Sequence, residues 1–213
     1  MNRSTHGLDT HILADRPDVR LIYGLVDAGA RILDLGCGTG ELLALLMHHK
    51  NARVQGIEMD GRAVYECVKK GLSVFQGDIE SGLAEYPDGS FDYVILNQSL
   101  QEVRKVDYLI HEALRVGDKV VVGFPNFAHA AARIMLALGG RSPVTSSLPY
   151  LWYDTPNVRF LSIKDFRIFC AGEGLAILKA HYLGRKGPLH VWPNLRALNA
   201  VFILAGREKG EPQ

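Results

Sequence analysis

A glycine-rich turn at residues 32–41 is the feature of this sequence best suited to binding a ligand. It reads Ile-Leu-Asp-Leu-Gly-Cys-Gly-Thr-Gly-Glu, an apolar run that ends in three closely spaced glycines. Glycine allows positive φ and close approach of a ligand, and a helix that begins after the turn offers free N–H groups. Dinucleotide sites need the spacing G-x-G-x-x-G around a pyrophosphate. Here the spacing is G-x-G-x-G, and the carboxylates of Asp34 and Glu41 would repel a diphosphate. Asp34 instead suits a ligand that ends in a cationic amino group.

The elements that must position this turn follow from alternating short apolar runs and amphipathic stretches. Repeated strand and helix patterns predict right-handed βαβ crossovers and a mostly parallel sheet. We expect an α/β fold with a single doubly wound, Rossmann-like sheet of about seven strands and an antiparallel C-terminal edge strand. The expected strands are 31–35, 53–58, 72–76, 91–96, 119–124, 175–182 and 200–205, and the expected helices are 41–50, 60–71, 102–116 and 163–171.

The chain is expected to form one domain at 17–208, with an N-terminal extension at 1–16 and a tail at 209–213. The periodicity breaks between residues 127 and 160, where a short helix near 128–138 leads into a stretch rich in proline and aromatic residues. Long irregular segments in compact domains usually carry function. We therefore expect residues 127–160 to form a lid over the ligand or a surface for a partner.

The composition is that of a globular protein and argues against broad nucleic-acid binding and membrane insertion. The 213 residues are 47% hydrophobic and 22% charged, with 24 Lys+Arg against 23 Asp+Glu, which is typical of a globular protein and argues against broad nucleic-acid binding. No signal peptide or membrane-spanning run is visible, so we expect a cytoplasmic protein that does not associate with membranes. Cys37, Cys67 and Cys170 are too widely spaced for a metal site or a disulfide framework and are expected to be reduced.

The G-x-G-x-G turn behind an apolar strand and an aspartate resembles motif I of class I S-adenosylmethionine (SAM) methyltransferases. The resemblance implies that Gly36, Cys37, Gly38 and Gly40 contact the methionyl end of SAM, or of its product S-adenosylhomocysteine. It also implies that Asp34 reaches the ammonium group of SAM, directly or through water.

The same resemblance assigns the acids and amides at the following strand ends. Glu58 would take the two ribose hydroxyls, because a carboxylate accepts from both, and Met59 beside it could pack on the adenine. Asp78 would accept from the adenine amino group, with Ile79 next to it, and Asn97-Gln98 would border the sulfonium. These residues lie at the carboxyl ends of expected parallel strands, where open α/β sheets bind ligands.

Further motifs resemble one family in particular, the methionine biosynthesis protein MetW family. They include L-D-L-G-C-G at 33–38, G-E-L-L at 40–43, L-R-V-G at 114–117, F-P-N-F at 124–127 followed by His129, P-V at 143–144, L-P-Y at 148–150, W-Y at 152–153, T-P-N at 155–157, D-F at 165–166 and W-P-N-L at 192–195. The resemblance implies a role in methionine biosynthesis beside a homoserine O-acyltransferase. It departs at Arg159, where the family often has histidine, which argues against a proton-transfer role at that position.

Catalytic residues are not fixed by the sequence. SAM carries an activated methyl group, so positioning can do much of the work, but an acceptor of high pKa also needs a base. His129, Tyr153 and Asp154 are weak candidates, and each has a structural alternative: a helix-surface histidine, a lid or partner-surface tyrosine and a turn aspartate. We assign no base.

Two hypotheses from different classes remain open. The chain is either a SAM-dependent methyltransferase of a small molecule or a SAM-binding accessory subunit that transfers no methyl group. A nucleic-acid methyltransferase is disfavoured, because neither Asn97-Gln98-Ser99 nor Phe124-Pro125-Asn126 carries the paired prolines of the N/D-P-P-Y signature. The segment 127–160 discriminates: a wall over the sulfonium favours catalysis, and an exposed apolar surface favours a partner.

Overall fold

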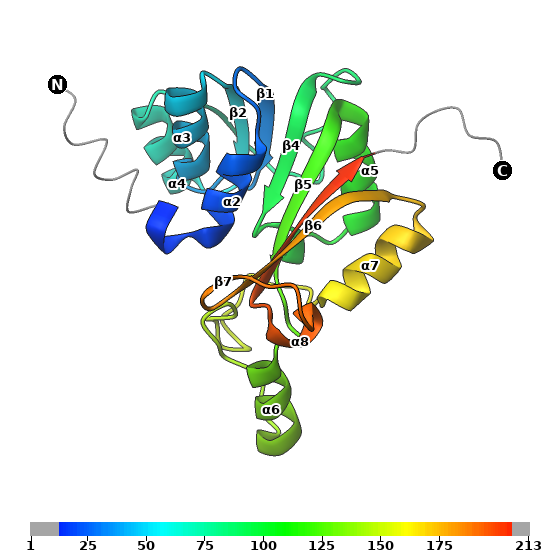
Figure 1. Cartoon of the computed structure of the whole chain (residues 1–213). Helices are drawn as coiled ribbons and strands as arrows, with labels where there is room; N and C mark the ends of the chain where they lie inside the picture. Colours follow the sequence, from blue (N-terminus) through cyan, green and yellow to red (C-terminus); the bar gives the residue numbers. More distant parts are fainter. Residues whose placement is uncertain (1–12, 206–213) are drawn as a thin grey trace.

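Eight strands form one sheet in the order β3-β2-β1-β4-β5-β8-β6-β7 (Figure 1). The computed structural model describes residues 13–205 of the chain. The five strands from β3 to β5 are parallel, and β8 runs antiparallel to both β5 and β6. The strands are β1 (Arg31–Leu35), β2 (Arg53–Glu58), β3 (Ser73–Gln76), β4 (Phe91–Asn97), β5 (Gly117–Pro125), β6 (Ala176–Gly184), β7 (Gly187–Pro188) and β8 (Asn199–Ala205).

Helices cover both faces of the sheet, because successive strand side chains point to opposite sides. Ile32 packs into the core with α2 (Pro17–Leu25), α3 (Glu41–Lys50) and α4 (Gly61–Lys69), whereas Leu33 packs into the core with α5 (Val106–Val116) and α7 (Ile163–Gly172). The remaining helices are η1 (Leu100–Glu102), α6 (Ala130–Gly139) and α8 (Pro193–Arg196). The expected α/β fold with a mostly parallel, doubly wound sheet is confirmed.

The C-terminal strands refine the expected edge of the sheet. β8 is antiparallel as expected, but it lies between β5 and β6, and its residues from Ala200 to Leu204 are buried. A continuous apolar run of this kind is typical of an inner strand that is covered on both faces. β6 is more exposed, and the two-residue β7 pairs with its end as the eighth strand.

One other element boundary differs from the pattern in the sequence, whereas the short helix expected near 128–138 is present as α6. The expected helix at 102–116 begins at Val106, because residues 100–102 form the separate 3-10 turn η1. The segment 127–160 contains α6 and two isolated bridges, Thr145–Leu148 and Leu151–Asp154, but no named strand. The expected tail at 209–213 and most of the expected extension at 1–16 lie outside the described residues.

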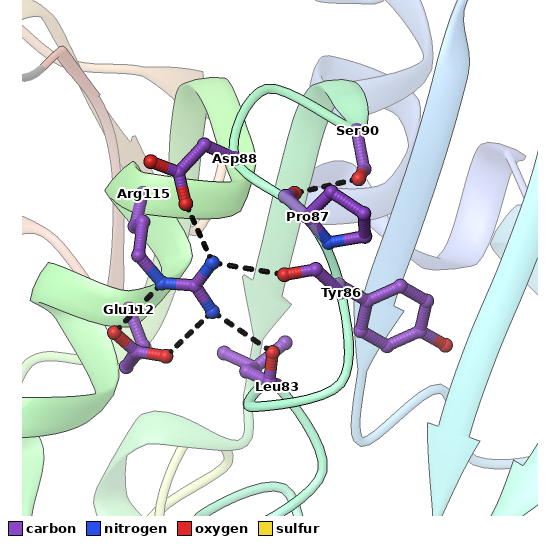
Figure 2. Close-up of polar contacts among 7 residues, drawn as sticks. All are labelled: Leu83, Tyr86, Pro87, Asp88, Ser90, Glu112 and Arg115. Atoms are coloured by element: carbon purple, nitrogen blue, oxygen red, sulfur yellow. Dashed lines mark hydrogen bonds and ion pairs between the residues drawn. The ribbon is translucent and has the colours of Figure 1, made fainter.

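Arg115 on α5 fixes the long connection between β3 and β4 (Figure 2). Its guanidinium donates to Glu112 on the same helix at 2.7 Å and to Asp88 at 2.8 Å. It also donates to the carbonyl oxygens of Tyr86 at 2.8 Å and Leu83 at 3.0 Å. A single side chain thus satisfies backbone groups of a segment that has no ladder of its own.

No helix within residues 13–205 is long and apolar enough to cross a lipid bilayer.

Candidate functional site

The glycine turn is pinned to the end of the neighbouring strand. The backbone N–H of Gly36 donates to the carbonyl oxygen of Ile57 on β2 at 2.8 Å, and that of Cys37 donates to the same oxygen at 3.3 Å. The Cys37 side chain packs against β2, where its Sγ would lie 2.6 Å from a Cβ at Gly56.

Glycine is required at two positions of the turn by both conformation and space. Gly36 has φ of +77° and a Cβ there would lie 2.7 Å from the Cβ of Ser99. Gly40 has φ of +75° and a Cβ there would collide with Leu72 and Cys67. Gly38, between them, has no atom within 4 Å of its Cβ position, so the middle of the turn is open. This combination forms a tight turn with an accessible backbone.

Asp34 is a buried carboxyl group directly before the turn. Its side chain lies on β1, with 4% of the residue exposed. Burial, and then the negative charge of Glu58, raise the pKa of Asp34 to about 7. A charged carboxylate in this place is costly without a cation, because low-dielectric surroundings disfavour the ionised form. Asp34 is therefore suited to a ligand that brings a positive charge.

Glu58 at the end of β2 braces the same turn. Its Oε2 accepts from the backbone N–H of Gly38 at 2.8 Å, and its Oε1 accepts from those of Met59 and Asp60 at 2.9 Å. A carboxylate oxygen can accept about two hydrogen bonds, so Oε2 keeps capacity for a hydroxyl donor. Glu58 thus stabilises the turn and remains able to bind.

The next strand end presents an exposed carboxylate. Asp78 follows β3, and its Oδ1 accepts from the backbone N–H of Glu80 at 2.9 Å, which forms a local turn. Ile79 is half-buried and packs against the core, whereas Met59 is 64% exposed. Met59 and Ile79 line the same cleft as the carboxylates of Glu58 and Asp78.

Asn97 at the end of β4 is held by a helix that the sequence analysis left out of the site. Its Nδ2 donates to Asp18 on α2 at 2.8 Å, and Asp18 also accepts from Arg16 at 2.8 Å. Burial alone would raise the pKa of Asp18, but the hydrogen bonds and the charge of Arg16 together with Asn97 hold that pKa below its ordinary value. The Oδ1 of Asn97 is buried without a hydrogen-bond partner in the described structure.

Three adjoining clefts surround these residues. The loop cleft, of about 190 Å³, is bordered by Asp34, the turn and Asn97. The strand-end cleft, of about 420 Å³, is bordered by Glu58, Met59, Asp78 and Ile79. The polar cleft, also of about 420 Å³, is bordered by α2 and by Ser146, Ser147, Pro149, Tyr150 and Asn157 of the irregular segment.

Gln98 connects the three clefts, since it lines each of them. It has φ of +63°, a left-handed conformation that a non-glycine residue seldom adopts. Its N–H donates to the carbonyl oxygen of Gly123 on β5 at 2.8 Å, and its own carbonyl accepts from Gln101 at 2.6 Å. Strained backbone of this kind is concentrated at functional sites.

The clefts near the turn are strongly acidic. Among the described residues that line the loop cleft and the strand-end cleft, Arg16 is the only base, beside the six acids Asp34, Glu41, Glu58, Asp78, Glu80 and Glu102. Such a lining favours a cationic ligand and opposes a pyrophosphate. Both clefts lie where the strand order reverses between β1 and β4, the usual ligand position in open α/β sheets.

Comparison of the sequence with known protein families identifies the family of this chain. The sequence profile described as "Methionine biosynthesis protein MetW" matches residues 16–204. The chain belongs to the MetW family. The match begins at Arg16, the base that borders the loop cleft.

Curated relatives of this MetW-family chain are longer than the chain itself. It is 38% identical over 159 residues to "Bifunctional methionine biosynthesis protein MetXA/MetW" of Rhodopirellula baltica. The aligned region covers 70% of this chain and 26% of that relative. The chain is 30% identical over 98 residues to "Ribosomal protein L11 methyltransferase" of Burkholderia mallei, which covers 46% of the chain and 32% of that protein. The chain thus spans about a quarter to a third of the length of these relatives.

Solved structures share the fold at low sequence identity. A SAM-dependent methyltransferase from Archaeoglobus fulgidus has a TM-score of 0.69 at 13% identity, covering 93% of this chain and 94% of that chain. One from Mesorhizobium loti has a TM-score of 0.67 at 16% identity, covering 90% and 99%. The MetW-family chain therefore has the fold of SAM-dependent methyltransferases.

The candidate bases lie away from the clefts. His129 caps the start of α6, with its Nδ1 accepting from the backbone N–H of Ala131 at 3.2 Å. Tyr153 is 68% exposed and packs edge-to-face on Trp152, and Asp154 is exposed on the same stretch. None of the three lines the clefts described above, and in this MetW-family chain the catalytic role stays unassigned.

The irregular segment has one part that borders a cleft and another part that is exposed. Ser146, Asn157 and their neighbours form a wall of the polar cleft, whereas Trp152 and Tyr153 face solvent. Arg159 ties the segment to the body, since its Nε donates to the carbonyl oxygen of Val103 at 3.0 Å and its guanidinium also contacts the carbonyl oxygen of Arg104. In this MetW-family chain Arg159 therefore fixes the wall.

Arg16 and Asp18 are the site residues that sequence reasoning missed. They lie at the start of α2, outside the strand ends that carry the predicted site, and reach the site only when α2 packs beside α3. The usable signal was weak: an aspartate in the first turn of an apolar helix, directly after a proline.

Proposed function

We propose that this MetW-family chain binds SAM in the loop and strand-end clefts and acts as a SAM-responsive accessory subunit of a homoserine O-acyltransferase in methionine biosynthesis. One observation carries the ligand assignment: three carboxylates stand at the ends of consecutive parallel strands, around an open glycine turn and in two adjoining clefts whose described lining residues include a single base. That donor set suits a molecule that carries two positive charges, two ribose hydroxyls and an adenine amino group.

The residues divide the ligand between them. Asp34 would hold the ammonium group, and Arg16 is the available partner for the carboxylate. Glu58 would accept from the ribose hydroxyls through its spare lone pairs, and Asp78 would accept from the adenine amino group. Gly36, Cys37, Gly38 and Gly40 would offer backbone groups, and Met59 and Ile79 would provide apolar surface for the adenine. Asn97 would border the sulfonium. When bound, SAM supplies an activated methyl group.

The partner assignment is supported by the relative from Rhodopirellula baltica. Its printed name joins MetXA and MetW in one protein, and this chain aligns with only 26% of it. We take MetXA as the acyltransferase that the family resemblance implies. Two activities in one chain act at a high effective concentration, which suits proteins that work together. A subunit that binds SAM, the product made from methionine, could report pathway output to an early enzyme.

The binding test is calorimetric titration of the chain with SAM and with S-adenosylhomocysteine. We expect Asp34→Ala and Glu58→Ala each to weaken SAM binding by about 1–3 kcal/mol, the cost of a lost charged hydrogen bond. Glu66→Ala, which removes an exposed acid on α4 away from the clefts, is the matched control and should bind normally. Equal affinity in the wild type and both cleft variants would mean that SAM does not bind here.

The partner test is co-purification with the homoserine O-acyltransferase of the same organism, followed by acylation assays with and without SAM. We expect a stable complex and an acylation rate that changes on addition of SAM. If no complex forms and SAM leaves the rate unchanged, the accessory role is wrong, whatever the calorimetry shows.

Methyl transfer to a small molecule is the second candidate function, and the polar cleft is the observation that favours it. Gln101 and Asn157 line this cleft, and in the described structure Gln101 Oε1 and Asn157 Oδ1 are buried without a hydrogen-bond partner. The cleft meets the loop cleft at Arg16 and Gln98. Formation of S-adenosylhomocysteine from SAM, measured with and without homoserine as a probe acceptor, discriminates: turnover favours catalysis, and its absence favours the accessory role.

A further inference from the structure

Helix α6 (Ala130–Gly139) is apolar apart from Arg133 and is nevertheless mostly exposed. Its sequence AAARIMLALG contains one charge, and Ala132 is its only buried residue. Ile134, Leu136 and Leu138 are 57%, 52% and 85% exposed. Figure 1 shows that the helix projects from the body of the molecule, beyond the carboxyl end of β5. Helices that are hydrophobic all round are normally buried, so this one requires a cover.

The helix is held firmly at its base. Asn126, which is fully buried, donates through Nδ2 to the carbonyl oxygen of Ala197 at 2.9 Å and accepts through Oδ1 from the backbone N–H of Ala128 at 3.2 Å. His129 caps the first turn, and the Nε of Arg133 donates to the carbonyl oxygen of Ala128 at 2.6 Å. The fold thus presents α6 in a fixed direction, which lowers the entropic cost of docking.

A hollow of about 390 Å³ lies between the base of α6 and the helices α7 and α8. Trp192 borders it with 72% of the residue exposed, in a left-handed conformation with φ of +50°. The charged residues that line it are Arg133, Lys164 and Arg167, all basic. We call α6 and this hollow together the α6 surface. It combines a protruding apolar helix, an exposed tryptophan and a basic rim.

The charges discriminate between possible occupants. A second copy related by a two-fold axis would place the basic rim of Arg133, Lys164 and Arg167 opposite the same basic rim, and like charges in an interface cost several kcal/mol. The complementary partner has an apolar groove for α6 and acidic residues around it, a helix-in-groove arrangement. The fused relative places this family in one chain with another protein named MetXA.

We infer that the α6 surface is the docking site for the homoserine O-acyltransferase. This inference rests on the partner named in the proposed function and assigns it a location. Ile134 and Leu138, four residues apart, form one face of α6 and enter an apolar groove of the enzyme. Trp192 and the bases beside it contact the acidic rim. The segment that follows α6 also forms the wall of the polar cleft, so the docking site and the ligand site share one stretch of chain.

The test measures affinity between the chain and the acyltransferase of the same organism by calorimetry. We expect Leu138→Asp and Trp192→Ala each to weaken binding about thirtyfold or more, as for buried interface anchors. Val68→Asp is the matched control: Val68 is 58% exposed on α4, which packs on the opposite face of the sheet from α7, and this variant should bind within twofold of the wild type. Binding should also weaken as salt rises, because the rim is charged.

Outcomes separate this inference from the proposed function. Thermal unfolding is measured first in each variant, and a cooperative transition near the wild-type midpoint shows that the variant is folded. If the wild type binds the enzyme and both α6-surface variants bind equally well, the docking site is wrong and the partnership stands. If the wild type does not bind, both fail. If the free chain is a dimer by light scattering and Leu138→Asp makes it a monomer, the occupant is a second copy and the inference is overturned.

Discussion

Protonation of Asp34 should make SAM binding strongly dependent on pH. Burial and the charge of Glu58 raise the pKa of Asp34 to about 7, whereas its ordinary value is 3.8. Below pH 7 the free protein therefore holds this carboxyl neutral, and it must release a proton before it can pair with the ammonium of SAM. The other charged groups around the loop cleft are Arg16 and Glu41, with Asp18 paired to Arg16.

The size of the pH effect on SAM affinity follows from the coupling between ionisation of Asp34 and SAM binding. A single group that must ionise lowers affinity up to tenfold per pH unit below its pKa, so affinity should fall about tenfold from pH 8 to pH 6. The same shift destabilises the free protein: a carboxyl whose folded pKa is raised loses stability as pH rises from about 4 through about 7. The loss approaches about 4 kcal/mol above that range. Bound SAM relieves this loss by supplying a cation.

Two assays check the reasoning. Calorimetric titrations with SAM between pH 6 and 8 should show the slope in the wild type and a flat profile in Asp34→Asn, which separates Asp34 from any titration of the ligand. Asp78→Asn, an exposed acid in the same site, should weaken binding but keep the slope. Thermal unfolding of the free protein should show Asp34→Asn more stable than the wild type at pH 8 and similar at pH 4. A wild-type slope that survives in Asp34→Asn would refute the argument.

Three other substitutions test parts of the site. Gly40→Ala should lower the free energy of unfolding, measured by thermal melts, by about 1–3 kcal/mol, because the new Cβ collides with Leu72 and Cys67 at positive φ. Gly139→Ala, in open space on α6, is the control and should be neutral or stabilising by up to about 1 kcal/mol in the same melts. Asp18→Asn should weaken SAM binding about tenfold, because Arg16 and Asn97 lose their shared anion; unchanged calorimetric affinity would remove α2 from the site. Arg115→Met should cost about 1–3 kcal/mol in urea unfolding, since it frees the carbonyl oxygens of Leu83 and Tyr86, and the exposed Arg53→Met is its control.

The strand ends illustrate what could be predicted. Asp34, Glu58 and Asp78 each follow a short apolar run, and parallel strands joined by helices bring their carboxyl ends to one edge of the sheet. The local pattern therefore predicts that the three acids meet, and the structure brings Glu58 and Asp34 close enough to shift a pKa. The inner position of β8 in the sheet was harder to predict from the sequence, because strand order depends on which faces of the sheet are covered and not on the apolar run of β8 itself.

The sequence by itself determined the parallel α/β sheet, the glycine turn and the acids at the strand ends, since these depend on local periodicity and on backbone conformations that only glycine adopts readily. Tertiary structure alone decided that Asp34 is buried, that Arg16 and Asp18 join the site from α2, that Gln98 connects three clefts and that α6 is exposed within residues 13–205. Burial and proximity arise from packing between segments far apart in the chain, so no window of sequence contains them. The sequence shows which residues are acidic at the strand ends, whereas the charge state of Asp34 depends on the residues that pack around it.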